Sequence, residues 1–290
     1  MLSPCSRSRV IDSRIFIKNL DCIDSAIFNE QLGVFGVSWL VHLTAIGTVD
    51  DNYFVYDFRK LKQEIRRYLH EHIDHRLLLP TNPYVRYHQN RWQLHSEQGV
   101  WEYTCPATAV CQLPLTIINI ETVATILQTR IQQHLKHLPR LQVSLTTDQL
   151  TAGQKFHYTH GLPGHDGNCQ RLLHGHQGFL QVYTDSQRQP QLEQHLITKV
   201  LKHYVHFANS LHTKHNSTSI EVCYESKQGY FSAKLPRQQC LVLPEQETSI
   251  ESISQYLATY LRNNYNLQQP TRIICYEGFN KGAEVALLHN

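Results

Sequence analysis

The sequence predicts an α+β protein that contains two copies of one folding unit. Candidate elements follow the same order twice, namely two strands, a helix, a hairpin, a second helix and a closing strand. Three short matches also recur at a constant offset of 130 positions, which indicates an internal repeat with units at 1–148 and 149–290. They are Gln98-Gly99 and Gln228-Gly229, Leu113-Pro114 and Leu243-Pro244, and Glu121 and Glu251, and Thr147 falls opposite Glu277 at the same offset.

The elements of the first unit follow from its apolar pattern. β-Branched and aromatic residues favour strands, alternation around Ser96-Glu97-Gln98-Gly99 favours a hairpin, and apolar residues at three- and four-residue spacing favour helices. Asp57 is a plausible N-cap for the first helix. The predicted elements are strands at Ile15–Leu20 and Trp39–Ile46, a helix over 57–75, a hairpin over 84–105, a helix over 120–135 and a strand at Leu141–Thr146.

The second unit repeats this order with a shorter hairpin. Its first helix is predicted to be long, and Ser249 marks the start of its second helix. The predicted elements are strands at Phe156–His160 and Gly178–Thr184, a helix over Leu192–Ala208, a hairpin over 218–235, a helix from about Ser249 and a strand at Arg272–Cys275.

Each unit is therefore expected to form a four-stranded antiparallel sheet with two helices on one face. Such a sheet has edges that must be paired or covered. We expect the units to close into a barrel by forming a homo-oligomer. A dimer or a multiple of dimers would let first and second units alternate, and a trimer is the alternative.

The composition excludes several classes of protein. A net charge of +3 gives no strong attraction to nucleic acid or to a membrane surface. No apolar run approaches the roughly 20 residues of a membrane span. The eight cysteines form no Cys-x-x-Cys pair, and the first ten residues lack the apolar core of a signal peptide. We expect a cytoplasmic protein with reduced thiols.

The stretch from Phe156 to His176 carries the strongest signal for a functional site. His160 ends a predicted strand, and His174 and His176 begin the next one. Residues two apart in a strand point to the same face, so His174 and His176 can bind one ion together. Three imidazoles suit a zinc site with one open coordination position, and Cys169 lies in the loop between them. The alternative is a set of polar strand residues with no common role.

These motifs together resemble the 6-pyruvoyltetrahydropterin synthase / 6-carboxytetrahydropterin synthase family. The resemblance implies the tunnelling fold (T-fold) for each unit, a bound Zn²⁺ and a pterin triphosphate substrate. It covers nearly the whole chain as two tandem copies. The residues that carry it are Phe156-His-Tyr-Thr-His160, Cys169, His174-Gly-His176, Asp57-Phe58, Asp74-His75, Glu121 and Glu277.

The hallmarks of the family are divided between the two units. The first unit keeps Asp74 and His75 but has Asp24, Phe35 and Val37 where the family has metal-binding histidines. The second unit keeps the three histidines, Cys169 and Glu277, but no Asp-His pair stands at the corresponding place.

The resemblance therefore implies a composite site. His160, His174 and His176 would bind zinc, Cys169 would act as general base, and Glu277 would anchor the pterin. Asp74 and His75, from the first unit of an adjacent domain, would assist Cys169. Open alternatives are His212 or His215 as the partner of Cys169, and His165 or Asp166 as a substitute acid or base.

The implied activity is a zinc-dependent lyase that converts 7,8-dihydroneopterin triphosphate to 6-carboxy-5,6,7,8-tetrahydropterin, on the queuosine route to modified tRNA bases. The loop from Gly161 to His176 favours this branch. The alternatives are 6-pyruvoyltetrahydropterin synthase, a dihydroneopterin phosphate aldolase, or a catalytically silent pterin-binding scaffold.

Overall fold

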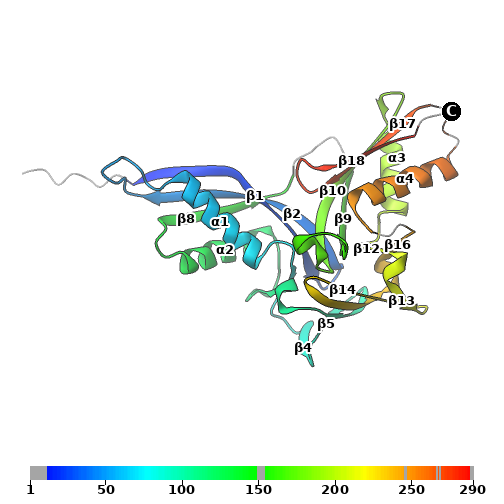
Figure 1. Ribbon diagram of the computed structural model, residues 1–290, viewed down its shortest axis with the longest axis horizontal. Coiled ribbons are helices and arrows are strands. Elements are labelled where there is room, and N and C mark those ends of the chain that lie inside the picture. The colour runs from blue at the N-terminus through cyan, green and yellow to red at the C-terminus, as the bar shows by residue number, and fades with distance from the viewer. Residues whose placement is uncertain (1–11, 149–153, 245–246, 266, 268, 288–290) are drawn as a thin grey trace, which may run out of the picture.

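Two mixed sheets, each with a pair of helices, make up most of the molecule (Figure 1). The computed structural model describes residues 12–148, 154–244, 247–265, 267 and 269–287. The predicted linker around 147–154 therefore lies mostly outside the described residues. Among the described residues, no helix is long and apolar enough to cross a membrane.

The first sheet has the strand order β7-β3-β1-β2-β8. Helices α1 and α2 pack against it, and the apolar core between them includes Leu61 and Ile65 of α1 and Leu127 of α2. The side chain of Asp57 accepts a hydrogen bond from the amide of Lys60, which confirms the predicted N-cap. The bounds are β1 Ser13–Asn29, β2 Gly33–Gly47, α1 Phe58–His72, β3 Leu77–Leu79, β7 Val110–Gln112, α2 Ile120–His134 and β8 Arg140–Thr146.

The second sheet has the order β16-β12-β9-β10-β17-β18, with β11 paired to β10. Helices α3 and α4 pack on it around a core that includes Phe156, Leu196 and Leu257. The bounds are β9 Gln154–His160, β10 His174–Thr184, β11 Gln187–Arg188, α3 Pro190–Lys199, β12 Val205–Ala208, β16 Cys240–Leu243, α4 Ile250–Asn264, β17 Thr271–Glu277 and β18 Gly282–Leu287.

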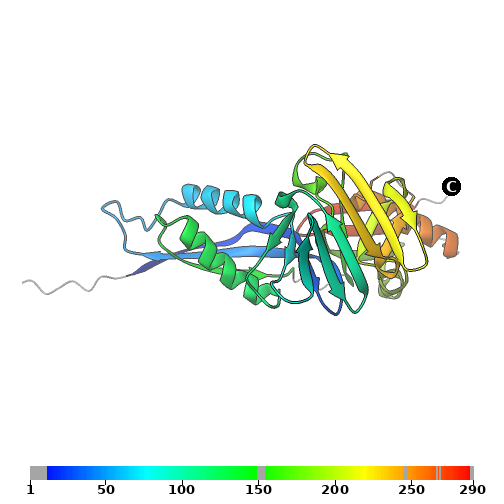
Figure 2. The same cartoon turned by 90° about the horizontal axis from the view of Figure 1, so that it is seen from below.

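The hairpins of both halves join in a third sheet, seen in Figure 2, with the order β13-β14-β15-β6-β5-β4. Strand β15 pairs with β6, so that Ala233 lies opposite Tyr103. Beneath this sheet, a shared core contains Trp101 and Tyr103 together with Phe207 and Phe231. The two halves of the chain are thus joined by backbone pairing and by buried aromatic residues. The bounds are β4 Val85–His88, β5 Arg91–Ser96, β6 Gly99–Thr104, β13 His212–His215, β14 Ser219–Ser226 and β15 Gly229–Pro236.

This architecture is α+β, as predicted, but it differs from two four-stranded antiparallel sheets. Short parallel strands extend both sheets, because β3 pairs with β1 and β7, and β12 pairs with β9 and β16. The helix predicted over Leu192–Ala208 ends at Lys199, and residues 205–208 form the buried strand β12 instead. Val205 and Phe207 favour a strand there, and the parallel partners on both sides outweigh the helical spacing.

Candidate active site

The three predicted metal ligands lie together on one face of the second sheet. His160 ends β9 and is paired with His174, the first residue of β10, and the centroids of their rings are 4.5 Å apart. His176 follows two residues later, and its ring lies 5.3 Å from that of His160. All three side chains are buried, and each offers a ligand atom within 4.8 Å of the others.

Two of these histidines hold the tautomer that a metal ligand needs. The Nδ1 atoms of His160 and His174 donate hydrogen bonds to the carbonyls of Thr248 and Arg171, at 2.8 and 2.7 Å. Their Nε2 atoms are buried and have no hydrogen-bond partner among the described residues. Burial lowers the pKa of His160 to about 3 and that of His174 well below its usual value. Neutral rings with free, buried Nε2 lone pairs fit a metal ion.

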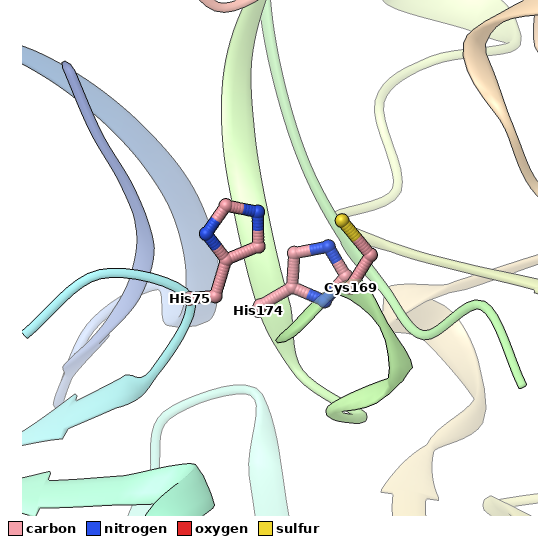
Figure 3. A group of neighbouring side chains, drawn as sticks. All are labelled: His75, Cys169 and His174. Atoms are coloured by element: carbon pink, nitrogen blue, oxygen red, sulfur yellow. The ribbon is translucent and has the colours of Figure 1, made fainter. Parts of the chain in front are cut away.

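A second group shares His174 with the first and contains the predicted catalytic residues His75 and Cys169 (Figure 3). His75 comes from the turn after α1, and Cys169 comes from the 3-10 turn at Gly167–Gln170. The ligand atoms of His75, Cys169 and His174 lie within 4.8 Å of one another, and the rings of His75 and His174 are stacked at 5.0 Å. The thiol of Cys169 is therefore close to an imidazole of the first half and to a predicted metal ligand of the second.

Asp74 holds His75 in a charged state. The Nδ1 atom of His75 is 2.7 Å from Oδ2 of Asp74. Burial lowers the pKa of His75, but the bond to Asp74 and the nearby Cys169 outweigh it and raise the pKa to about 10. Burial raises the pKa of Asp74, but bonds from His70 and His75 hold it at about 2. At neutral pH the pair is an ionised carboxylate with a protonated imidazole.

Within one chain, Asp74 and His75 of the first half lie beside Cys169 and His174 of the second half. Arg171 makes part of this connection, because its Nη1 atom lies 3.4 Å from the carbonyl of Asp74 and 3.5 Å from that of His75. Of the alternatives, Asp166 is exposed and pairs with Lys227. The side chains of His212 and His215 lie outside the described residues.

Glu277, the predicted substrate anchor, ends β17 close to the metal-ligand group. Its Oε1 accepts a hydrogen bond of 2.7 Å from the hydroxyl of Tyr158 and is 3.6 Å from Nε2 of His176. Its Oε2 is 3.7 Å from Nζ of Lys281. Burial raises the pKa of Glu277, but His176, His160 and Lys281 lower it to about 2. The carboxylate is thus ionised, and Oε2 is the oxygen that is more open to a further hydrogen bond.

Several residues of the site were not assigned a role from the sequence. Arg171 and Lys281 belong to no recognisable motif, and only the fold brings them to Asp74 and Glu277. Tyr158 stands where the family has alanine. This difference is the one feature of the sequence that points to its role, which is a hydrogen bond to Glu277. Asp24 stands where the family has a metal-binding histidine, and only the fold makes it a neighbour of His176.

Comparison with known proteins gives a family match for the second half of the chain. The sequence profile of the family 6-pyruvoyl tetrahydropterin synthase matches residues 149–286. No curated protein is significantly similar to the chain in sequence.

Among solved structures, 6-pyruvoyltetrahydropterin synthase of Plasmodium vivax is 18% identical, with a TM-score of 0.40, over 48% of this chain and 94% of that one. The Plasmodium falciparum enzyme is 19% identical, with a TM-score of 0.39, over 47% and 91%. The family profile gives the firmer result: residues 149–286 of this chain form a domain of the 6-pyruvoyl tetrahydropterin synthase family.

Proposed function

We propose that the chain is a zinc-dependent lyase that converts 7,8-dihydroneopterin triphosphate to 6-carboxy-5,6,7,8-tetrahydropterin, a precursor on the queuosine route to modified tRNA bases. The observation that carries the proposal is the contact of two groups, the buried cluster of His160, His174 and His176 and the Cys169–His75–Asp74 series. The family match over residues 149–286 supports pterin-processing lyase chemistry.

His160, His174 and His176 would hold the zinc ion. Bound zinc would polarise hydroxyl groups of the substrate side chain. Zinc suits this donor set because imidazole nitrogen is one of its common ligands.

The chain's own residues would move the proton and orient the ring. Cys169 would remove a proton from the substrate side chain as its thiolate. His75 would hold the proton of the thiol, as its raised pKa of about 10 allows, and Asp74 would fix the imidazole in place. Glu277 would accept hydrogen bonds from the 2-amino group and a ring N–H of the pterin. Because the hydroxyl of Tyr158 already donates a hydrogen bond to Oε1, Oε2 would accept most of the hydrogen bonding from the pterin.

The same proposal includes the organisation of the chain. Residues 1–148 and 149–290 would be two tandem T-fold units derived by duplication. The first would have lost its metal site and kept the Asp-His pair. The whole would act as a cytoplasmic homo-oligomer, preferably a dimer or a multiple of dimers, whose assembly closes the barrels.

The test is to incubate the zinc-loaded protein with 7,8-dihydroneopterin triphosphate and to identify the products by mass. 6-Carboxytetrahydropterin with acetaldehyde would support the proposal, and a Cys169→Ala variant should give neither. A 6-pyruvoyl product would assign the reaction after which the matched family is named. Absence of turnover, with zinc and the pterin bound, would favour a silent pterin-binding scaffold.

A further inference from the structure

Asp24 of the first half of the chain lies against a predicted metal ligand of the second half. It is buried in β1, and its Oδ1 is 3.4 Å from Nδ1 of His176. Nδ1 of His176 is itself buried and makes no regular hydrogen bond within the described part of the chain. The carboxylate of Asp24 is therefore an acceptor placed next to a buried ring nitrogen that has no hydrogen-bond partner among the described residues.

The carboxylate of Asp24 is held from several sides. The hydroxyl of Ser38 donates to Oδ1 at 2.5 Å and also accepts from the amide of Gln177 at 3.1 Å. Lys281 donates to Oδ2 at 3.1 Å. Gly278 packs so closely that a Cβ there would lie 2.8 Å from Oδ1. This surrounding fixes the position of the carboxylate beside the His176 ring.

The backbone of Asp24 also contacts the pair formed by Asp74 and His75. Its amide donates to Oδ1 of Asp74 at 2.9 Å, and its carbonyl accepts from the amide of His75 at 2.8 Å. One residue thus contacts the Asp-His pair through its main chain and His176 through its side chain.

From these contacts we infer that Asp24 is a positioning residue for the metal centre, which accepts the Nδ1 proton of His176 and so directs Nε2 of that ring to the metal. The inference rests on the proposed zinc site. Metal-binding histidines commonly donate their second N–H to a carboxylate, which sets the tautomer and ring orientation and raises the basicity of the ligand. The first half of the chain would then support the metal centre without supplying a ligand.

The first test is zinc affinity, measured by competition with a chromophoric chelator. Asp24→Asn keeps the shape but removes the charge, and Asp24→Ala removes the acceptor. We expect dissociation constants about 10- to 100-fold higher than that of the wild type. The matched control is Glu64→Gln, which removes another carboxylate of the first half that is 2.7 Å from a histidine, His137. Its zinc affinity should equal that of the wild type.

The second test needs no variant and separates positioning from a general structural role. Imidazole ¹⁵N spectra of the zinc-loaded wild-type protein should show the proton of His176 on Nδ1. A proton on Nε2, or Asp24 variants that bind zinc within about twofold of the wild type, would overturn the inference and leave the zinc site intact. A wild-type chain that binds no zinc would overturn both this inference and the proposed metal centre.

Discussion

Replacing Gly36 by alanine should disrupt the contact between the two halves of the chain. Gly36 lies on β2 where this strand crosses β9 and β10. A Cβ at this position would lie 2.0 Å from the carbonyl oxygen of Tyr158 and 2.3 Å from the amide nitrogen of His176. Both atoms belong to the backbone, so no side chain can rotate away. Relief requires β2 to separate from the second sheet by roughly 1 Å, since such atoms normally stay more than 3 Å apart.

The energetic cost follows from this geometry. Overpacking a core costs about 1–3 kcal/mol and occasionally more. Since Gly36 meets backbone atoms only, we expect a loss of about 3 kcal/mol in the free energy of unfolding. For a chain of this size, that corresponds to a decrease of roughly 5 °C in Tm. Zinc affinity should fall as well, because the backbone of His176 is displaced.

Gly47→Ala on the same strand provides the control. A Cβ there would meet its nearest atoms at 3.4 and 3.6 Å, which are ordinary contacts. This variant should match the wild type or gain about 0.4–1 kcal/mol, because alanine restricts the unfolded chain. The assay is urea unfolding followed by tryptophan fluorescence and far-ultraviolet circular dichroism. If Gly36→Ala and Gly47→Ala unfold at the same urea concentration, the close crossing of the strands is refuted.

Three further predictions concern the site. His75→Ala and Cys169→Ala should each lower kcat about 10²- to 10⁴-fold. Mixing the two variants should not restore activity, because both residues meet within one chain. Recovery of activity in the mixture would contradict this. The Asp74–His75 pair should stabilise the fold most between about pH 4 and 6.5: its contribution should decline as the pH falls toward the Asp74 pKa of about 2, and again as the pH rises toward the His75 pKa of about 10. Urea unfolding of the wild type and of His75→Gln across pH 3–10 checks this, and a constant difference between them would contradict it. Removal of zinc by a chelator should lower Tm, and zinc at 100 times its dissociation constant should restore about 2.7 kcal/mol; His174→Ala should show no such response in a thermal scan.

The local part of this structure could be predicted from the sequence because it depends on near neighbours in the chain. His174 and His176 share a face since they are two residues apart in a strand. The helix that begins at Phe58 and the turn before Gly229 follow from capping and turn residues. The cluster of His160 with His174 needed only the antiparallel pairing of two adjacent strands.

The long-range part was decided by the tertiary structure. Strands of three or four residues, such as β3 and β12, are too short to show a period and exist because parallel partners flank them. The joining of the hairpins through Ala233 and Tyr103 likewise has no local signature.

The same distinction applies to the site. Sequence alone identified His160, His174, His176 and Cys169 as a chemical group, because they lie within one short stretch. Only the fold showed that His75 reaches Cys169 within the same chain and that Asp24 reaches His176. The physical reason is that the type of side chain and its local spacing determine what chemistry is available, whereas contacts between residues far apart in the chain depend on how the sheets pack.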